Sequence, residues 1–244
     1  MFELDWYIVV NIETLLLKSV NKFKETYKSI APLIILYTLL SYLFTPPTLR
    51  SLQLKQNFDD LLMQINNQDV LFSILLALIF SLYTIVINQF ILINIKRTVF
   101  KISRTINALI LFFILYIILL LSFLFMVLII PIPDLILVFF IIMYVSLFFS
   151  IYINLDYNKT LIECLVICYI LFTKNFKNIF KLILMHGLAL VLITYAMVIA
   201  GLFVTQIIGN MSIVIINILF YFSSYFLSIV WVYYYLSMDK KFIS

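Results

Sequence analysis

The amino-acid sequence predicts an all-helical, polytopic membrane protein with six transmembrane helices and both termini in the cytoplasm. Its composition and the distribution of its basic residues lead to this prediction. Of the 244 residues, 66% are hydrophobic and 11% are charged, and the mean hydropathy is +1.20. Soluble domains are about 45–50% apolar and about 25% charged. A globule of this size has too much surface to hide such an excess of apolar side chains, so the composition excludes a soluble enzyme, a disordered chain and a secreted disulfide scaffold.

Six apolar runs are long enough to cross a membrane as helices. A helix needs about 20 apolar residues to span about 30 Å of hydrocarbon. Open strands leave backbone groups unsatisfied in lipid, and the runs lack the polar–apolar alternation of a transmembrane β-barrel. The predicted spans are 27–45, 70–95, 106–130, 135–155, 182–206 and 211–236.

The basic residues predict how these spans are oriented. Loops on the cytoplasmic side of a membrane carry an excess of lysine and arginine. The chain has 16 such residues, and only Arg50 and Lys55 fall in loops on the opposite side. The others precede the first span, follow the sixth, or lie between the second and third and between the fourth and fifth. We therefore expect residues 1–244 to form a single integral membrane domain with both ends inside the cell.

Two further segments are predicted to lie along the cytoplasmic face as amphipathic helices. In residues 11–27, apolar side chains recur at helical spacing and polar ones occupy the rest of the helical wheel. Residues 159–180 contain the apolar stretch 161–172, which is too short to cross the bilayer. Both segments would hold lysines against anionic lipid.

A short phenylalanine–lysine pattern recurs in these two segments. It occurs as Phe23-Lys24 and again as Phe176-Lys177, each followed by a second aromatic–lysine pair four residues later. The recurrence fits an internal duplication of a surface helix followed by a hairpin. It fits better with a codon bias combined with the general need for cations at the inner membrane interface.

The predicted spans contain no aspartate, glutamate, lysine or arginine near their midplanes. Ionisable residues inside a membrane usually mark proton relays, ion paths or counter-ions for a substrate. Their absence from these spans argues against a pump, a proton-coupled transporter and an intramembrane hydrolase.

Few residues are candidates for a catalytic or metal site. His186, at the cytoplasmic start of the fifth span, is either an interfacial polar residue or a titrating switch. Cys164 and Cys168 share a helix face and are structural, palmitoylated or redox-active, but a zinc site needs four ligands. Phosphate-loop, GxSxG, HExxH and CxxC motifs are absent from the sequence. We therefore predict no catalytic, cofactor-binding or metal-binding residue and no cofactor.

Polar residues within the apolar spans have two interpretations. They are Asn88, Gln89, Thr205, Gln206 and Asn217. Such groups can hydrogen-bond between helices, at about 0.6 kcal/mol each. They could also line a path for a polar solute.

Several short motifs resemble those of a known family. They are NKFKETYK before the first span, FTPP at its end, NFDDLLMQI in the outer loop, VLIIPIP at the end of the third span and TKNFKNIF before the fifth. This layout resembles the YciC-like family of uncharacterised bacterial inner-membrane proteins. It is more distantly similar to the membrane domain fused to some glycerophosphodiester phosphodiesterases. The family favours glycine after the proline that closes the third span, whereas here Ile132 follows Pro131.

The resemblance implies an integral protein of the bacterial inner membrane without assigned catalytic residues. We expect a non-enzymatic role in envelope or lipid homeostasis, with membrane lipids as partners through their anionic head groups at the cytoplasmic face. The net charge of +5 is then explained by head groups and not by nucleic acid. The alternative is a carrier or channel for a small neutral solute, which Asn88, Gln89 and Asn217 would favour.

Overall fold

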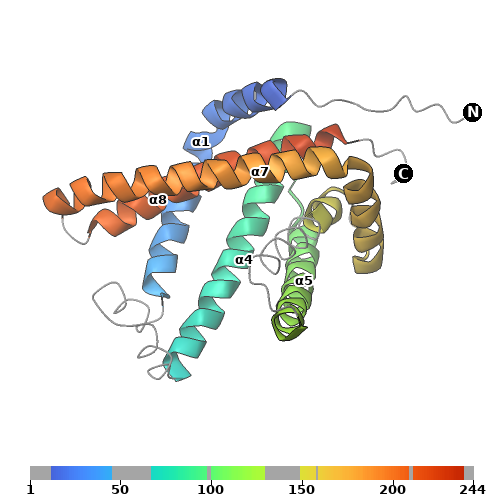
Figure 1. Ribbon diagram of the computed structural model, residues 1–244, viewed down its shortest axis with the longest axis horizontal. Coiled ribbons are helices and arrows are strands. Elements are labelled where there is room, and N and C mark those ends of the chain that lie inside the picture. Colours follow the sequence, from blue (N-terminus) through green and yellow to red (C-terminus); the bar gives the residue numbers. More distant parts are fainter. Residues whose placement is uncertain are drawn as a thin grey trace, which may run out of the picture. The chain divides into compact units, whose positions relative to one another are not determined.

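The fold is helical throughout the part of the chain that the computed structural model describes. That part comprises residues 12–45, 67–97, 100–129, 149–157, 159–208 and 211–238, with only the backbone described at 120, 123–129, 202–208 and 211–213. The helices are α1 (Ile12–Leu43), α4 (Asn67–Lys96), α5 (Ile102–Ile129), α7 (Leu161–Ile208) and α8 (Met211–Ser237), together with the helical segment 149–157 (Figure 1). No strand occurs within these ranges.

Within the described residues, five helices are long and apolar enough to cross a membrane. These stretches are Ile12–Leu43, Asn67–Lys96, Ile102–Leu119, Leu161–Gly201 and Val214–Ser237. They overlap the first, second, third, fifth and sixth predicted spans, and they indicate a multi-pass membrane protein. The fourth predicted span, 135–155, lies mostly outside the described residues, and its final residues belong to the helical segment 149–157.

Helix α1 is longer than the predicted first span. The sequence predicts an amphipathic helix over 11–27 followed by a span over 27–45, whereas one continuous helix covers both as far as Leu43. Pro32 lies inside it and has no N–H to donate to the carbonyl group of Lys28, four residues earlier. Membrane helices tolerate such a proline because neighbouring groups satisfy the freed carbonyl.

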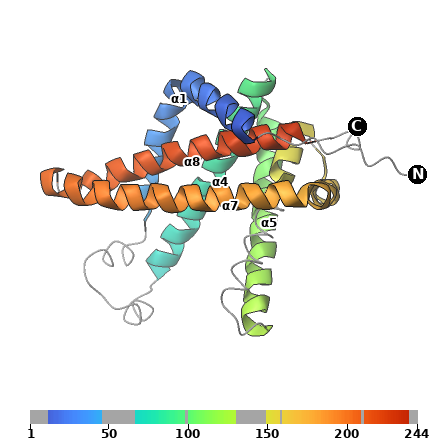
Figure 2. The ribbon, with the colours of Figure 1, turned by 45° about the horizontal axis from the view of Figure 1, so that its top comes forward.

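Helix α7 likewise joins two elements that were predicted separately. The expected surface helix, 159–180, and the fifth span, 182–206, belong to one helix of 48 residues. The first turns of α7 run in a different direction from the turns that follow them (Figures 1 and 2). The helix continues because no proline interrupts it, and Gly187 and Gly201 are tolerated at a modest cost.

The chain divides into two compact units, each of which is described here by itself. Unit 1 comprises Met1–Glu25, Ile85–Leu192 and Tyr225–Ser244, and unit 2 comprises Thr26–Thr84 and Ile193–Ser224. The divisions fall within α1, α4, α7 and α8, so each of these helices contributes residues to both units.

The core of unit 1 is aromatic. The ring of Phe149 lies edge-on to that of Trp231, with centroids 5.7 Å apart, and the rings of Tyr152 and Tyr235 are 5.4 Å apart. These contacts pack α8 against the helical segment 149–157. Such aromatic pairs stabilise a protein by about 0.5–1.5 kcal/mol beyond the burial of their area.

The core of unit 2 contains a cluster of three tyrosines. Tyr37 of α1 stacks on Tyr83 of α4 with ring centroids 3.9 Å apart, and Tyr221 of α8 meets Tyr37 edge-on at 4.7 Å. In the same unit α7 and α8 approach closely at Gly201. A Cβ atom at that position would lie 2.8 Å from Cδ1 of Ile216.

Large apolar side chains remain exposed along the helices, as expected for a surface covered by lipid chains. On α7 they include Leu184, Leu188, Val191 and Leu192 in unit 1 and Tyr195 and Val198 in unit 2. In water an apolar stripe of this length would be a site of aggregation or association. In a bilayer it needs no protein partner.

Candidate functional site

The basic side chains are concentrated in unit 1. Among the described residues of unit 2, Lys28 carries the only basic side chain. The described lysines and arginines of unit 1 lie on α1, at the carboxyl end of α4, at the amino end of α5, and on the first half of α7 together with Lys159 just before it. Most of the basic side chains that the structure describes therefore belong to unit 1.

A buried carboxylate, that of Asp156, lies at the centre of these contacts. Its side chain is only 7% exposed, and Lys96 at the end of α4 donates from Nζ to Oδ1 at 2.5 Å. The hydroxyl group of Tyr235, on α8, donates to Oδ2 at 3.3 Å. A buried charge is tolerated only when it is paired and hydrogen-bonded. These two contacts meet that condition, and we call Asp156, Lys96 and Tyr235 the aspartate centre.

The end of the helical segment 149–157 is held by a second cation. Arg104 of α5 donates from Nη1 to the carbonyl oxygens of Leu155 and Asp156, at 3.1 and 3.2 Å. A cation at this position satisfies the last carbonyls of a helix and complements its dipole. The ammonium group of Lys96 also lies 5.4 Å from the centroid of the Tyr157 ring. Burial and the nearby Asp156 carboxylate raise the pKa of Tyr157.

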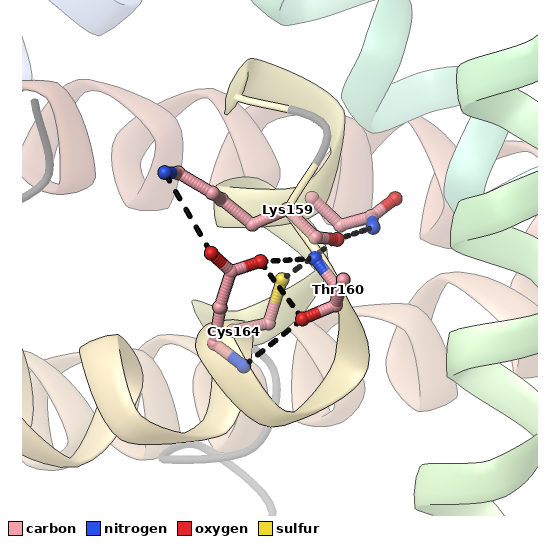
Figure 3. Close-up of polar contacts among 5 residues, drawn as sticks. Lys159, Thr160 and Cys164 are labelled. Carbon is pink, nitrogen blue, oxygen red and sulfur yellow. Dashed lines mark hydrogen bonds and ion pairs between the residues drawn. The ribbon is translucent and has the colours of Figure 1, made fainter.

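The start of α7 is fixed by a capping box (Figure 3). The Glu163 carboxylate accepts hydrogen bonds from the backbone N–H and the hydroxyl group of Thr160, both at 2.8 Å, and the Glu163 N–H donates to Thr160 Oγ1 at 3.4 Å. This reciprocal arrangement satisfies donors that a helix otherwise leaves unpaired at its amino end. Lys159 Nζ lies 3.8 Å from the same carboxylate.

The two cysteines are packed inside unit 1. The carbonyl oxygen of Lys159 accepts a hydrogen bond from Asn154 Nδ2 at 2.8 Å and a weaker contact from Cys164 Sγ at 3.6 Å (Figure 3). Cys164 and Cys168 are both buried and both free thiols. A buried thiol is shielded from oxidants and metal ions, and reactivity requires an exposed thiolate. The geometry is that of two packed side chains on one face of α7.

One of the polar residues of the second predicted span connects α4 to the start of α5. Gln89 is 4% exposed, and its Nε2 donates to the Lys101 carbonyl oxygen at 3.2 Å. Thr105 donates from its hydroxyl group to Gln89 Oε1. Asn88 is also buried. The contacts of Gln89 are those of a residue that binds two helices together, while Asn217 lies half-buried in unit 2. The side chains of Thr205 and Gln206 lie outside the described part of the chain.

His186 connects α7 to α8. Its Nδ1 accepts a hydrogen bond from the indole N–H of Trp231 at 2.9 Å, within unit 1. The sequence leaves open an interfacial role or a switch for this histidine. The hydrogen bond gives it a role in pairing the two helices.

A cleft opens on the surface of unit 1 between α1, the end of α4 and the end of α8. It has a volume of about 310 Å³, and its walls include Lys18, Asn21, Lys22, Glu25, Arg97 and Tyr233. We refer to it as the basic cleft, because cations outnumber carboxylates on its walls. Across the described residues, no three side chains of histidine, cysteine, aspartate or glutamate lie together in a way that could hold a metal ion.

No family model, curated protein or solved structure matches this chain. Any role for the aspartate centre and the basic cleft must therefore be argued from their geometry.

Asp156, Lys96, Arg104 and Arg97 are not among the candidate site residues predicted from the sequence. For Asp156 a signal is present, because it is an acidic residue that directly follows an apolar run. For the basic residues no such signal exists, since every loop that the sequence predicts to be cytoplasmic carries lysine or arginine.

Proposed function

We propose that this chain is a non-enzymatic, multi-pass protein of a bacterial inner membrane that acts in envelope or lipid homeostasis. On this proposal it contacts anionic lipid head groups at the cytoplasmic face. The observation that supports it best is the concentration of cations in unit 1. Some lie at the carboxyl end of α4 and at the amino end of α5, and the others lie on α1, just before α7 and along the first half of α7. Anionic lipids attract such basic segments by about 1 kcal/mol for each cation near the surface.

The proposed topology has six spans with both termini inside. In such a chain the helices alternate in direction, so the end of the second span, the start of the third, the start of the fifth and the end of the sixth all lie on one side. The contacts of the aspartate centre join Lys96, Asp156 and Tyr235, which come from three of the segments assigned to that side. The proposed membership of the YciC-like family rests on the motifs alone.

Reporter fusions test this topology directly. A green fluorescent protein fused after Ser244 should fluoresce, and alkaline phosphatase fused at the same position should be inactive. The phosphatase should be active when it follows Pro47, which is assigned to the outer face. Phosphatase activity at the carboxyl terminus would overturn the orientation, and recovery of the protein in the supernatant after ultracentrifugation would overturn the membrane assignment altogether.

The non-enzymatic role is supported by the contacts of three acidic residues of unit 1. Asp156 is paired with Lys96, Glu163 belongs to the capping box and Glu25 is paired with Lys22 at 3.0 Å. A general acid or base needs a proton-transfer path to a substrate, and these carboxylates are occupied by structural contacts. Deleting the gene and profiling phospholipids in each leaflet should reveal an altered distribution. An unchanged profile together with normal detergent sensitivity would contradict the proposed role.

The alternative, a carrier or channel for a small neutral solute, rests on the buried amides Asn88 and Gln89. Cysteine substitutions along residues 70–95, treated with a water-soluble thiol reagent, distinguish it from the lipid role. Reaction on one face of the helix would indicate an aqueous path. Protection of every position within the membrane would exclude a path along this helix.

A further inference from the structure

We propose that the basic cleft binds the phosphate group of an anionic phospholipid head group. This inference rests on the proposed function, because it names a specific site for the lipid contacts that the function requires. It goes further in assigning those contacts to one place in unit 1 and not to the basic surface as a whole.

The first argument is the charge balance of the cleft. Lys22 and Glu25 form an ion pair with each other at 3.0 Å. Within the described part of the chain, neither Lys18 nor Arg97 takes part in an ion pair, although both line the cleft. The cleft therefore offers two cations whose charge nothing nearby in the described structure neutralises. A phosphate diester carries the complementary negative charge.

The second argument is the backbone of Arg97. This residue follows the last residue of α4 and has a φ of 54°, in the left-handed region. Glycine is the usual residue there, and a residue with a Cβ atom adopts this conformation at a cost of roughly 1–2 kcal/mol. Arg97 lines the cleft and carries a guanidinium group. Its planar arrangement of donors matches two phosphate oxygens at once, which a lysine cannot do.

The uncharged residues of the cleft fit the rest of a head group. Asn21 and Asn94 provide amide groups and Tyr233 a hydroxyl group on the same walls. Such groups can hydrogen-bond the glycerol hydroxyls of a head group such as that of phosphatidylglycerol. The volume of about 310 Å³ lies at the lower end of the range of ligand pockets, about 300–1,000 Å³. It suits a head group without its acyl chains.

The location of the cleft favours a lipid over a soluble phosphate. Its walls come from the part of α1 that precedes the first predicted span and from the carboxyl ends of α4 and α8. These are the points at which helices of a multi-pass protein reach the head-group layer. Inorganic phosphate shares the same chemistry, so the experiment must separate the two.

The test compares two double variants of the full chain with equal changes in charge. Lys18→Gln/Arg97→Gln removes the two unneutralised cations of the cleft. Lys177→Gln/Lys181→Gln removes two exposed lysines of α7 that do not line it. Each purified protein is placed in nanodiscs of phosphatidylcholine containing increasing amounts of phosphatidylglycerol. Native mass spectrometry then counts the phosphatidylglycerol molecules retained after the nanodisc is stripped.

We expect the wild-type protein and the α7 variant to retain one phosphatidylglycerol molecule, and the cleft variant to lose at least about tenfold in affinity for it. An equal loss of phosphatidylglycerol affinity in both variants would overturn the cleft as the binding site. The proposed function would remain, because a diffuse attraction of lipid to the basic surface would explain that result. Retention of no phosphatidylglycerol by the wild-type protein would count against both proposals.

Inorganic phosphate provides the second arm. It is added at millimolar concentration to the wild-type protein in nanodiscs that contain phosphatidylglycerol. We expect it not to displace the retained lipid. If physiological concentrations of phosphate displace phosphatidylglycerol, the proposal that the cleft binds a lipid is wrong. Thermal unfolding of each variant in phosphatidylcholine alone shows whether the substitutions leave the fold intact. If the cleft variant fails this control, Arg97→Lys replaces it. For Arg97→Lys we expect a smaller loss of affinity for phosphatidylglycerol.

Discussion

The hydroxyl group of Tyr235 donates a hydrogen bond to Oδ2 of Asp156, a residue 79 positions earlier in the chain. This contact joins the last helix to the segment that precedes α7. Because Lys96 engages the other carboxylate oxygen, three parts of the chain that are distant in sequence meet at one buried charge. The contact can be tested with an internal control, since the neighbouring Tyr234 makes no equivalent bond.

Replacing Tyr235 with phenylalanine should destabilise the protein, whereas the same change at Tyr234 should not. Tyr235→Phe removes a donor to a buried carboxylate oxygen, at a cost of about 1–2 kcal/mol in the free energy of unfolding. The Tyr234 hydroxyl group is buried and has no hydrogen-bond partner within the described residues. Tyr234→Phe should therefore be neutral or slightly stabilising. Equilibrium unfolding in mixed micelles measures both, and equal effects would contradict the assigned contact.

The ion pair of the aspartate centre should matter more than the exposed pair near it. Asp156→Asn leaves Lys96 without its counter-ion in a partly buried site, and because Lys96 is 32% exposed we expect a loss of about 1–3 kcal/mol and not the full cost of a buried pair. Glu163→Gln removes the pair with Lys159, whose groups are 3.8 Å apart and more exposed. It should change the free energy of unfolding less than Asp156→Asn does, because this pair is exposed to solvent and glutamine preserves the capping box. A larger loss from Glu163→Gln would show that the exposed pair dominates.

The capping box at the start of α7 predicts a difference between two substitutions at Thr160. Thr160→Ala removes the hydroxyl group that both accepts from Glu163 N–H and donates to its carboxylate. It should destabilise the protein by about 1 kcal/mol. Thr160→Ser retains the hydroxyl group and should be close to neutral. Thermal unfolding followed by circular dichroism separates the two, and indistinguishable midpoints would show that the box does not stabilise α7.

The helical elements could be predicted because they depend on local sequence. The second predicted span lies within α4. A long apolar run in lipid forms a helix, because only a helix satisfies its backbone hydrogen bonds within the run. The ends of α1 and α7 were less predictable. A polar, amphipathic start and an apolar continuation differ in composition but share the same helical backbone. Composition changes at Tyr27 and near Phe180, whereas the helices continue through both positions.

The polar contacts of unit 1 were mostly beyond prediction. The capping box of Thr160 and Glu163 follows a spacing that the sequence displays, so it could have been found. The pairing of Lys96 with Asp156 depends on the packing of helices 60 residues apart, and no local pattern records it. The same holds for the basic cleft, since the left-handed backbone at Arg97 has no signature in the side chain itself.

The hydrogen bond between Trp231 and His186 predicts an energetic coupling between α7 and α8. Trp231→Phe retains an aromatic ring but removes the indole N–H, and it should cost about 0.6–1.7 kcal/mol, the range of such bonds in membranes. His186→Phe should cost a similar amount. If the two residues act through their bond at 2.9 Å, the double variant should cost less than the sum of the single variants. Additive losses would place the two side chains in independent roles.

The two glycines of α7 predict opposite responses to alanine. Alanine is favoured over glycine in a helix by about 0.5–1 kcal/mol, and a Cβ atom at Gly187 would meet nothing within 4 Å. Gly187→Ala should therefore stabilise the protein by that amount. At Gly201 the added Cβ atom would lie 2.8 Å from Ile216 Cδ1, and moving the isoleucine out of its rotamer costs about 0.5–1.5 kcal/mol. Gly201→Ala should be neutral or destabilising.

A third variant tests whether Ile216 is responsible for that difference. Ile216→Val removes the Cδ1 atom that the new Cβ atom would meet. In this background Gly201→Ala should recover a gain of up to about 0.5–1 kcal/mol, because the helix-propensity term is then unopposed. The comparison is made between Ile216→Val alone and the double variant, so the cost of the lost methyl group cancels. If Gly201→Ala remains unfavourable without Cδ1, the approach of α7 and α8 in unit 2 is closer than the single contact indicates.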